Sequence, residues 1–166
     1  MSKMIRVDGS VIEVSSLRSA LHTLSQAKSH GAEVLFLGVV REMNLGRRVE
    51  AVAYDAFQPL AEKTLAEITE EAKLKFNQDL RSVIFHRTGK LRVGEVSIGI
   101  AVSSCHRDEA YEASRFIIEE IKIRAPIWKK EYYVDGESEW LKGHALCSHG
   151  KKAHQESSPP FSSVTE

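Results

Sequence analysis

The sequence predicts a single α+β domain in which most strands pair antiparallel. Segments with helical and with strand periodicity are mixed along the 166 residues, without the strict strand–helix–strand alternation that is typical of a parallel α/β sheet. A chain of this length suits one hydrophobic core, and the sequence holds no internal repeat.

Apolar spacing and turn residues predict the elements of the first half. Residues 4–14 are expected to form two short strands around an Asp-Gly-Ser turn. Ser15 or Ser16 can cap a helix that reaches about residue 29. Pro59 favours the start of a second helix, because its missing N–H costs nothing in the first turn. A buried strand, a polar loop, another strand and this second helix are expected at 34–40, 41–48, 49–57 and 59–76.

The second half contains the strongest helical pattern of the chain, at residues 108–125. Pro126 closes this helix, because the residue before a proline resists helical dihedral angles. Strands are expected at residues 81–87, 96–103 and 128–134, with a turn at 88–90, a break at 93–94, a hairpin turn at 135–137 and a return segment from Trp140. Residues 147–166 are rich in Ser, His, Lys and Pro and nearly free of aliphatic side chains, so we expect a disordered tail after a domain at 1–146.

The composition is that of an ordinary globular protein, with 42% hydrophobic and 28% charged residues. Its 23 Lys and Arg balance 23 Asp and Glu, which argues against a general nucleic-acid-binding protein. The charge is nevertheless uneven, because residues 81–130 hold ten Lys and Arg against six Asp and Glu. The sequence therefore leaves room for a local basic site that binds a small anion.

The cysteine pattern and the apolar runs indicate the cellular compartment. Cys105 and Cys147 provide neither a disulfide framework nor a paired metal motif. The N-terminal residues lack the pattern of a signal peptide, and no apolar run approaches the roughly 20 residues of a membrane span. We therefore expect a cytoplasmic protein that binds no metal, membrane or nucleic acid.

Several lysines cluster around the proline that ends the long helix. Lys122 lies in the last turn of the helix, and Lys129 and Lys130 follow Trp128. A lysine held among apolar residues is a candidate for chemistry, because desolvation disfavours its charged form. Since consecutive residues of a strand face opposite sides, at most one of Lys129 and Lys130 can share a pocket with the neighbours of Trp128 on a given side. The alternative is that Lys122 extends along the apolar surface and places its charge in water.

Other basic residues stand at the ends of predicted elements. His106 and Arg107 precede the long helix, whose free N–H groups and dipole favour an anion, and arginine adds a bidentate donor for phosphate. Arg41 follows a buried strand and opens a polar loop, where binding residues are often found. Local capping and a solvated loop arginine are the competing interpretations. Cys105 is more typical of a small core residue than of a nucleophile.

A series of motifs, in order, connects the chain to a known family. They are Gly31-Ala32, Phe36-x-Gly38-x-Val40-Arg41, Tyr54, Ala61-Glu62, His86-Arg87-x-Gly89, Val93-Gly94-Glu95, Val102-Ser103-Ser104-x-His106-Arg107, Ala110, Ala113, Lys122-x-x-Ala125-Pro126-Ile127-Trp128-Lys129-Lys130-Glu131, Gly136 and Trp140. Together they resemble the large, catalytic subunits of molybdopterin synthase, the MoaE family, over roughly residues 31–141. The block around Pro126 is the most distinctive part.

The resemblance implies both a fold and a function. It implies an α/β-hammerhead with an additional small antiparallel sheet, and a homodimer that binds a small ubiquitin-like sulfur-carrier subunit of the MoaD type at each end, giving a heterotetramer. The carrier's C-terminal thiocarboxylate would pass sulfur to cyclic pyranopterin monophosphate, and two transfers would form the dithiolene of molybdopterin. This sulfurtransferase of molybdenum cofactor biosynthesis would need no bound cofactor, because the sulfur arrives on the partner.

The resemblance also assigns site residues. It implies catalytic roles for Lys122 and Lys129. Glu131 is two residues on from Lys129, so the strand period places it on the same face, where it can orient Lys129. The substrate-binding residues that it implies are Val39, Val40, Arg41, His106, Arg107, Lys122, Lys129, Lys130 and Glu131.

The chain departs from the family pattern in two places. Cys105 stands where a plain small residue is more usual, and after Trp140 the chain offers only Lys142 and His144 where relatives can supply an arginine. Two other functions remain open from the residues: a module that docks a ubiquitin-like tail without chemistry, and a regulator that binds a small anion or nucleotide.

Overall fold

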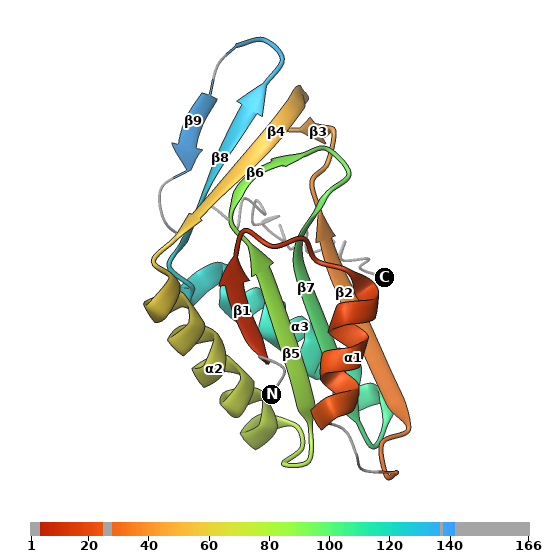
Figure 1. Cartoon of the computed structure of the whole chain (residues 1–166). Helices are drawn as coiled ribbons and strands as arrows, with labels where there is room; N and C mark the ends of the chain where they lie inside the picture. The colour runs from red at the N-terminus through yellow and green to blue at the C-terminus, as the bar shows by residue number, and fades with distance from the viewer. Residues whose placement is uncertain (1–3, 25–27, 137, 142–166) are drawn as a thin grey trace, which may run out of the picture.

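The computed structural model of the chain describes residues 4–24, 28–136 and 138–141. Twelve elements lie in these ranges: β1 (Ile5–Asp8), α1 (Val14–Leu24), β2 (Ala32–Val39), β3 (Met43–Asn44), β4 (Arg47–Ala56), α2 (Gln58–Lys75), β5 (Arg81–Arg87), β6 (Gly89–Arg92), β7 (Val96–Ser104), α3 (Arg107–Arg124), β8 (Ile127–Tyr133) and β9 (Ser138–Leu141). They form two sheets and three helices, which confirms the α+β class (Figure 1).

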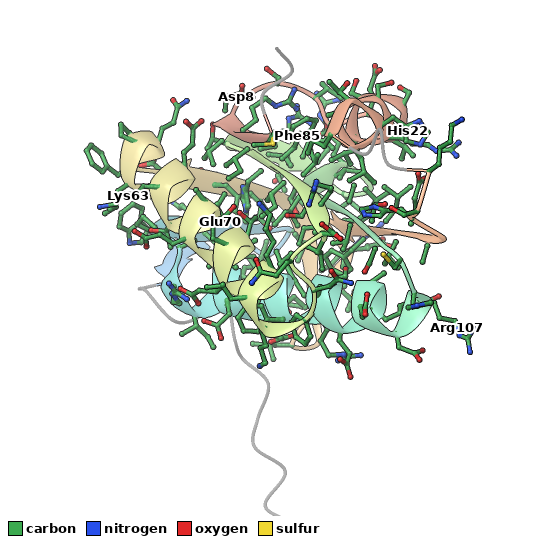
Figure 2. The ribbon with its side chains drawn as sticks, turned by 90° about the horizontal axis from the view of Figure 1, so that it is seen from below. Asp8, His22, Lys63, Glu70, Phe85 and Arg107 are labelled. Carbon is green, nitrogen blue, oxygen red and sulfur yellow. The ribbon has the colours of Figure 1, made fainter. Side chains whose placement is uncertain are left out.

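The central sheet has the strand order β1-β5-β7-β2, and only its β1–β5 pair is parallel. Helix α1 covers one face of this sheet, and α2 and α3 cover the other (Figure 2). The alternation of β5 explains the two layers, because Val83 and Phe85 pack in the cluster with α1 whereas Ile84 packs in the cluster with α2 and α3.

The main core lies between the central sheet and the helices α2 and α3. Leu65 and Ile68 of α2 and Ile117 of α3 are fully buried there against the sheet. Each such side chain contributes on the order of 1.5–3 kcal/mol by its removal from water. On the other face, Gly99 of β7 lets α1 approach closely, since a Cβ at this position would lie 2.4 Å from Leu17 Cδ1.

The second sheet is antiparallel and extends beyond one end of the central sheet (Figure 1). Its order is β3-β4-β8-β9, and β6 also pairs with β4. In the β4–β8 register, Tyr54 lies opposite Lys129 and Val52 lies opposite Glu131. Because α3 ends at Arg124 and the extended Ala125 leads directly into β8, the chain brings the last turn of α3 next to this sheet.

Several local predictions differ from the structure. Residues 4–14 form one strand rather than two, because Ile12 is buried under α1 instead of pairing in a sheet. The predicted loop at 41–48 contains β3 and the start of β4, which pair as a tight hairpin. The turn predicted at 88–90 is instead the start of β6, where Gly89 adopts a positive φ of 91°.

Two further predictions reach residues beyond the described ranges. The first helix is described to Leu24, and the predicted continuation crosses residues 25–27, which lie outside those ranges. The domain boundary at 146 and the tail at 147–166 also lie outside them. Among the helices that the structure describes, none has the length and apolar composition to cross a membrane.

Candidate active site

A cavity of about 580 Å³ opens where β2, the C-terminal half of α3 and the second sheet meet. Four residues assigned from the sequence line it: Val39, Arg41, Lys122 and Lys129. Its apolar wall consists of side chains from β2, β7 and α3, namely Phe36, Ile98, Ile118 and Ile121. The cavity therefore combines three basic side chains with a largely apolar wall.

Both lysines reach the cavity because of the direct connection from α3 to β8. Lys122 leaves the last turn of α3 with 27% of its side chain exposed, and its Nζ lies 3.9 Å from the carboxylate of Glu119. Lys129 points from β8 toward the same cavity with 21% of its side chain exposed. Two partly desolvated ammonium groups from neighbouring elements thus face one space.

The carboxylate of Glu131 holds Lys129 in place. Glu131 is only 3% exposed, and one of its carboxylate oxygens forms a short ion pair with Lys129 Nζ. Its other oxygen accepts hydrogen bonds from the Tyr133 hydroxyl and, at 2.7 Å, from Asn44 Nδ2. Arg41 Nη2 donates to Asn44 Oδ1 at 3.2 Å, so one chain of contacts runs from Arg41 to Lys129. The shared face of Lys129 and Glu131 confirms the prediction from strand periodicity.

These contacts keep the Glu131 carboxylate charged. Burial alone would raise the pKa of Glu131, but hydrogen bonds from Lys129 and Tyr133, the charge of Lys129 and the bond from Asn44 lower it below its usual value. Burial and the hydrogen bond to Glu131 in turn raise the pKa of the Tyr133 hydroxyl, which stays a donor. The buried Glu131 carboxylate is thus the charged partner of Lys129 in their ion pair.

A histidine lies on the wall of the same cavity. His86 is 5% exposed, its Nδ1 lies 3.1 Å from the carbonyl oxygen of Arg87, and its ring packs edge-on against Tyr54 with the centroids 5.2 Å apart. Burial lowers the pKa of His86 to about 4, although the bond to the Arg87 carbonyl opposes the shift. His86 is therefore neutral at physiological pH.

The other residues assigned from the sequence lie elsewhere. Val40 is buried beside Val49 and Val52 and borders a smaller adjoining cavity of about 40 Å³. Lys130 faces the opposite side of β8 from Lys129, with its Nζ 5.3 Å from the ring centroid of Tyr132.

His106 and Arg107 stand at the far end of α3 from the cavity. Arg107 projects outward from the end of this helix in Figure 2. His106 and Lys122 are sixteen residues apart on α3, about 24 Å at a rise of about 1.5 Å per residue. The residues assigned from the sequence therefore separate into two groups within one chain.

Asn44, Tyr54, His86 and Tyr133 also line the cavity, although none of them is among the site residues assigned from the sequence. Tyr54 and His86 appear there only in the family motifs, and His86 also as half of a His-Arg pair at a strand end. Tyr133 carried a usable signal, because it follows Lys129 and Glu131 at the two-residue period of a strand. The others reach the cavity through pairing between segments far apart in sequence, as in the contact of Asn44 with Glu131, 87 residues away.

A second hollow adjoins the first along α3 and the edge strand β2. Its volume is about 460 Å³, and its walls include the exposed side chains of Leu35 and Tyr111. Phe36, Ile118 and Lys122 border both hollows, which makes the two surfaces continuous.

Comparison with known proteins places this architecture in a family. The family model described as MoaE protein matches residues 10–124. The chain belongs to the MoaE family. A molybdopterin synthase catalytic subunit from Synechococcus elongatus is 50% identical over 118 residues, which are 71% of this chain and 72% of the relative. One from Pyrococcus abyssi is 43% identical over 120 residues, 72% of this chain and 80% of the relative.

Two solved structures have the same fold. The molybdopterin synthase structure from Staphylococcus aureus superimposes with a TM-score of 0.76 at 38% identity, covering 84% of this chain and 97% of that chain. A complex of subunits 1 and 2 of molybdopterin-converting factor from Helicobacter pylori gives a TM-score of 0.67 at 21% identity, covering 84% and 91%. The latter likeness supports the fold alone.

Burial of neutral His86 predicts a specific loss of stability in acid. The pKa of His86 is about 4 in the folded protein against 6.5 for an ordinary histidine. As the pH falls from about 6.5 to about 4, the unfolded chain binds a proton that the folded chain does not, so the free energy of unfolding decreases. The size of the shift corresponds to about 3 kcal/mol, and this component should be absent in His86→Gln. Denaturant unfolding of both proteins between pH 7 and pH 4 measures it, and identical pH dependence would contradict the burial of a neutral ring.

Proposed function

We propose that this chain is the catalytic subunit of a molybdopterin synthase. It transfers sulfur from the C-terminal thiocarboxylate of a small ubiquitin-like, MoaD-type carrier to cyclic pyranopterin monophosphate. The names of its relatives support this reaction, and their similarity spans most of both chains. The observation that carries the proposal is the convergence of Lys122, Lys129 and Arg41 on one cavity.

The reaction needs a nucleophile, a site for negative charge and a proton carrier. The carrier's thiocarboxylate sulfur attacks an oxygen-bearing carbon of the substrate and forms a C–S bond. The electron pair of the C–O bond at that carbon moves to the oxygen, which takes up a proton and leaves as water or phosphate, and a thioester then joins carrier and substrate. Water then cleaves the thioester, releasing a carrier carboxylate and leaving the sulfur on the substrate as a thiolate. Lys122 suits the charge that develops at the reacting carbon, because a positioned cation stabilises a transition state more in a desolvated cavity than in water. Two such transfers complete the dithiolene, and neither requires a bound metal or organic cofactor.

Lys129 and its partners serve binding and proton transfer. The buried carboxylate of Glu131 keeps the Lys129 ammonium at a fixed place, where it can hold the carboxylate end of the carrier tail and move a proton. Arg41 presents a guanidinium suited to the substrate phosphate, and Asn44 joins it to Glu131. Substrate binding at Arg41 would thereby be connected to the position of Lys129.

A second copy of the chain would complete the site. Strand β2 is at the edge of the central sheet, and the hollow beside it exposes Leu35 and Tyr111. A two-fold interface over this surface, with its axis perpendicular to α3, would use the same patch of each copy and set the two α3 helices antiparallel. The N-terminus of one α3, with its His106 and Arg107, would then lie near the C-terminus of the other, with its Lys122. This arrangement would reunite the two groups of basic residues as one anion-binding site.

Lys122→Ala should abolish sulfur transfer while the fold and carrier binding persist. We expect product formation to fall by about 10²-fold or more, the magnitude typical for the loss of one group that stabilises transition-state charge. The assay is a single turnover with thiocarboxylated carrier and cyclic pyranopterin monophosphate, in which molybdopterin is detected by fluorescence after oxidation. Lys63→Ala, on the exposed surface of α2, is the matched control and should react as the wild type does (Figure 2). A wild-type protein that binds carrier but forms no product would contradict the proposal and favour a docking module.

Mixed dimers test whether the site is shared between copies. Lys122→Ala and Arg107→Ala homodimers should both be strongly impaired, because each lacks one residue in both sites. A heterodimer of the two variants, purified with two different tags, would contain one intact site and should recover about half of the wild-type product. If all pocket residues came from one chain, both sites of the heterodimer would be defective and no recovery would be measured.

A further inference from the structure

His86 presents an unused hydrogen-bond acceptor to the active-site cavity. A carbonyl oxygen only accepts, so the Nδ1 atom facing the Arg87 carbonyl must carry the ring proton. The Nε2 atom of the neutral ring is then an acceptor. Within residues 4–24, 28–136 and 138–141 it has no hydrogen-bond partner.

This acceptor is open to a partner from the cavity. His86 is 5% exposed and lines the cavity, so a molecule that displaces water from the cavity must replace the hydrogen bond that water makes to Nε2. The hydroxyl of Tyr54, whose ring packs edge-on against His86, also lacks a partner in the part of the chain that the structure describes. The two neighbouring rings thus bring one acceptor and one hydroxyl donor to the wall of one cavity.

The placement of this pair indicates which reactant it meets. The carrier tail ends at its reacting thiocarboxylate, which must reach Lys122 and Lys129. Those two lysine side chains are 27% and 21% exposed, whereas His86 is 5% exposed and is better shielded from solvent. Tyr54 is directly opposite Lys129 in the β4–β8 register, so the pair adjoins the reacting groups on the cavity wall. The small-molecule substrate, whose reacting carbon meets the end of the tail beside the lysines, is the reactant that fits against this shielded wall.

The surroundings of the pair suit a flat heteroaromatic ring. Phe36, Ile98 and Ile118 provide apolar walls for its faces. A pterin has an aminopyrimidinone edge on which N–H donors adjoin a carbonyl acceptor. That pattern is complementary to an acceptor beside a hydroxyl donor.

We propose that His86 Nε2 and the Tyr54 hydroxyl bind the aminopyrimidinone edge of the pterin substrate. His86 accepts one of its N–H groups, and Tyr54 donates to its carbonyl oxygen. This assignment rests on the proposed function and specifies which end of the substrate enters the cavity first. It makes His86 and Tyr54 determinants of substrate orientation, with the reacting carbon left beside the two lysines. Because burial lowers the pKa of His86 to about 4, Nε2 keeps its lone pair at neutral pH.

The test separates affinity for the pterin from affinity for the carrier. Single-turnover rates are measured against the concentration of cyclic pyranopterin monophosphate, and then against that of thiocarboxylated carrier. His86→Phe keeps a planar ring without the acceptor, and Tyr54→Phe removes only the hydroxyl. Each variant should weaken the apparent affinity for the pterin by about ten-fold or more, since a lost hydrogen bond leaves the substrate's polar edge unpaired. The affinity for the carrier should stay within about two-fold of wild type, because the carrier tail does not reach this pair.

The matched variants make the outcomes distinct. His86→Gln, which retains an acceptor, should recover part of the pterin affinity, and His22→Gln on the exposed side of α1 should behave as wild type. If His86→Phe does not fold, Tyr54→Phe decides the question alone. Unchanged pterin affinity in a wild-type-like active enzyme would overturn the inference and leave the proposed function intact. Weakened carrier affinity with unchanged pterin affinity would also overturn it, by assigning the pair to the tail. If the wild-type protein forms no product in this assay, the proposed function itself is wrong.

Discussion

The buried carboxylate of Glu131 is the interaction on which the rest of the active site depends. A charge at 3% exposure is costly unless it is both paired and hydrogen-bonded. Lys129 provides the opposite charge, and Tyr133 and Asn44 fill the remaining acceptor sites. The tight hairpin between β3 and β4 serves this arrangement, because Leu45 and Gly46, both at positive φ, turn the chain so that Asn44 reaches across to β8. The contacts that satisfy the Glu131 carboxylate therefore hold Lys129 and the β3–β4 hairpin in place. Through Asn44 they also position Arg41, which follows β2.

A second constraint comes from the way α3 passes into β8. Pro126 follows Ala125, which is already extended, so the helix stops and a strand begins without an intervening loop. Lys122 and Lys129 consequently lie on two rigid elements whose relative placement is set by core packing. In the proposed reaction one lysine stabilises charge on the substrate and the other carries protons. Both must stay within reach of the same atoms, which a flexible connection would not ensure.

The sequence predicts this site in part, and the limits have physical causes. The two-residue strand period correctly pairs Lys129 with Glu131 and separates Lys130, because that relation is local. The sixteen-residue spacing of His106 and Lys122 along one helix already implies that a single chain cannot bring them together. By contrast, no local sequence pattern predicts that His86 lies beside Tyr54. Their contact joins β5 of the central sheet to β4 of the second sheet, so it depends on how the two sheets meet. Strand β6 escapes prediction for a similar reason, because its four residues begin at a glycine and are held by pairing with β4.

The most direct test of this account is the single-turnover rate of Glu131→Gln with saturating carrier and pterin. Glutamine keeps the size and much of the hydrogen bonding of Glu131 but removes the charge that holds Lys129. We expect the rate to fall by about 10²-fold, because misplacement of one catalytic group by about 1 Å has an effect of that order. Circular dichroism should confirm a retained fold, and Glu67→Gln on the exposed face of α2 should react as wild type. A Glu131→Gln rate within about two-fold of wild type would contradict the central role of the buried carboxylate.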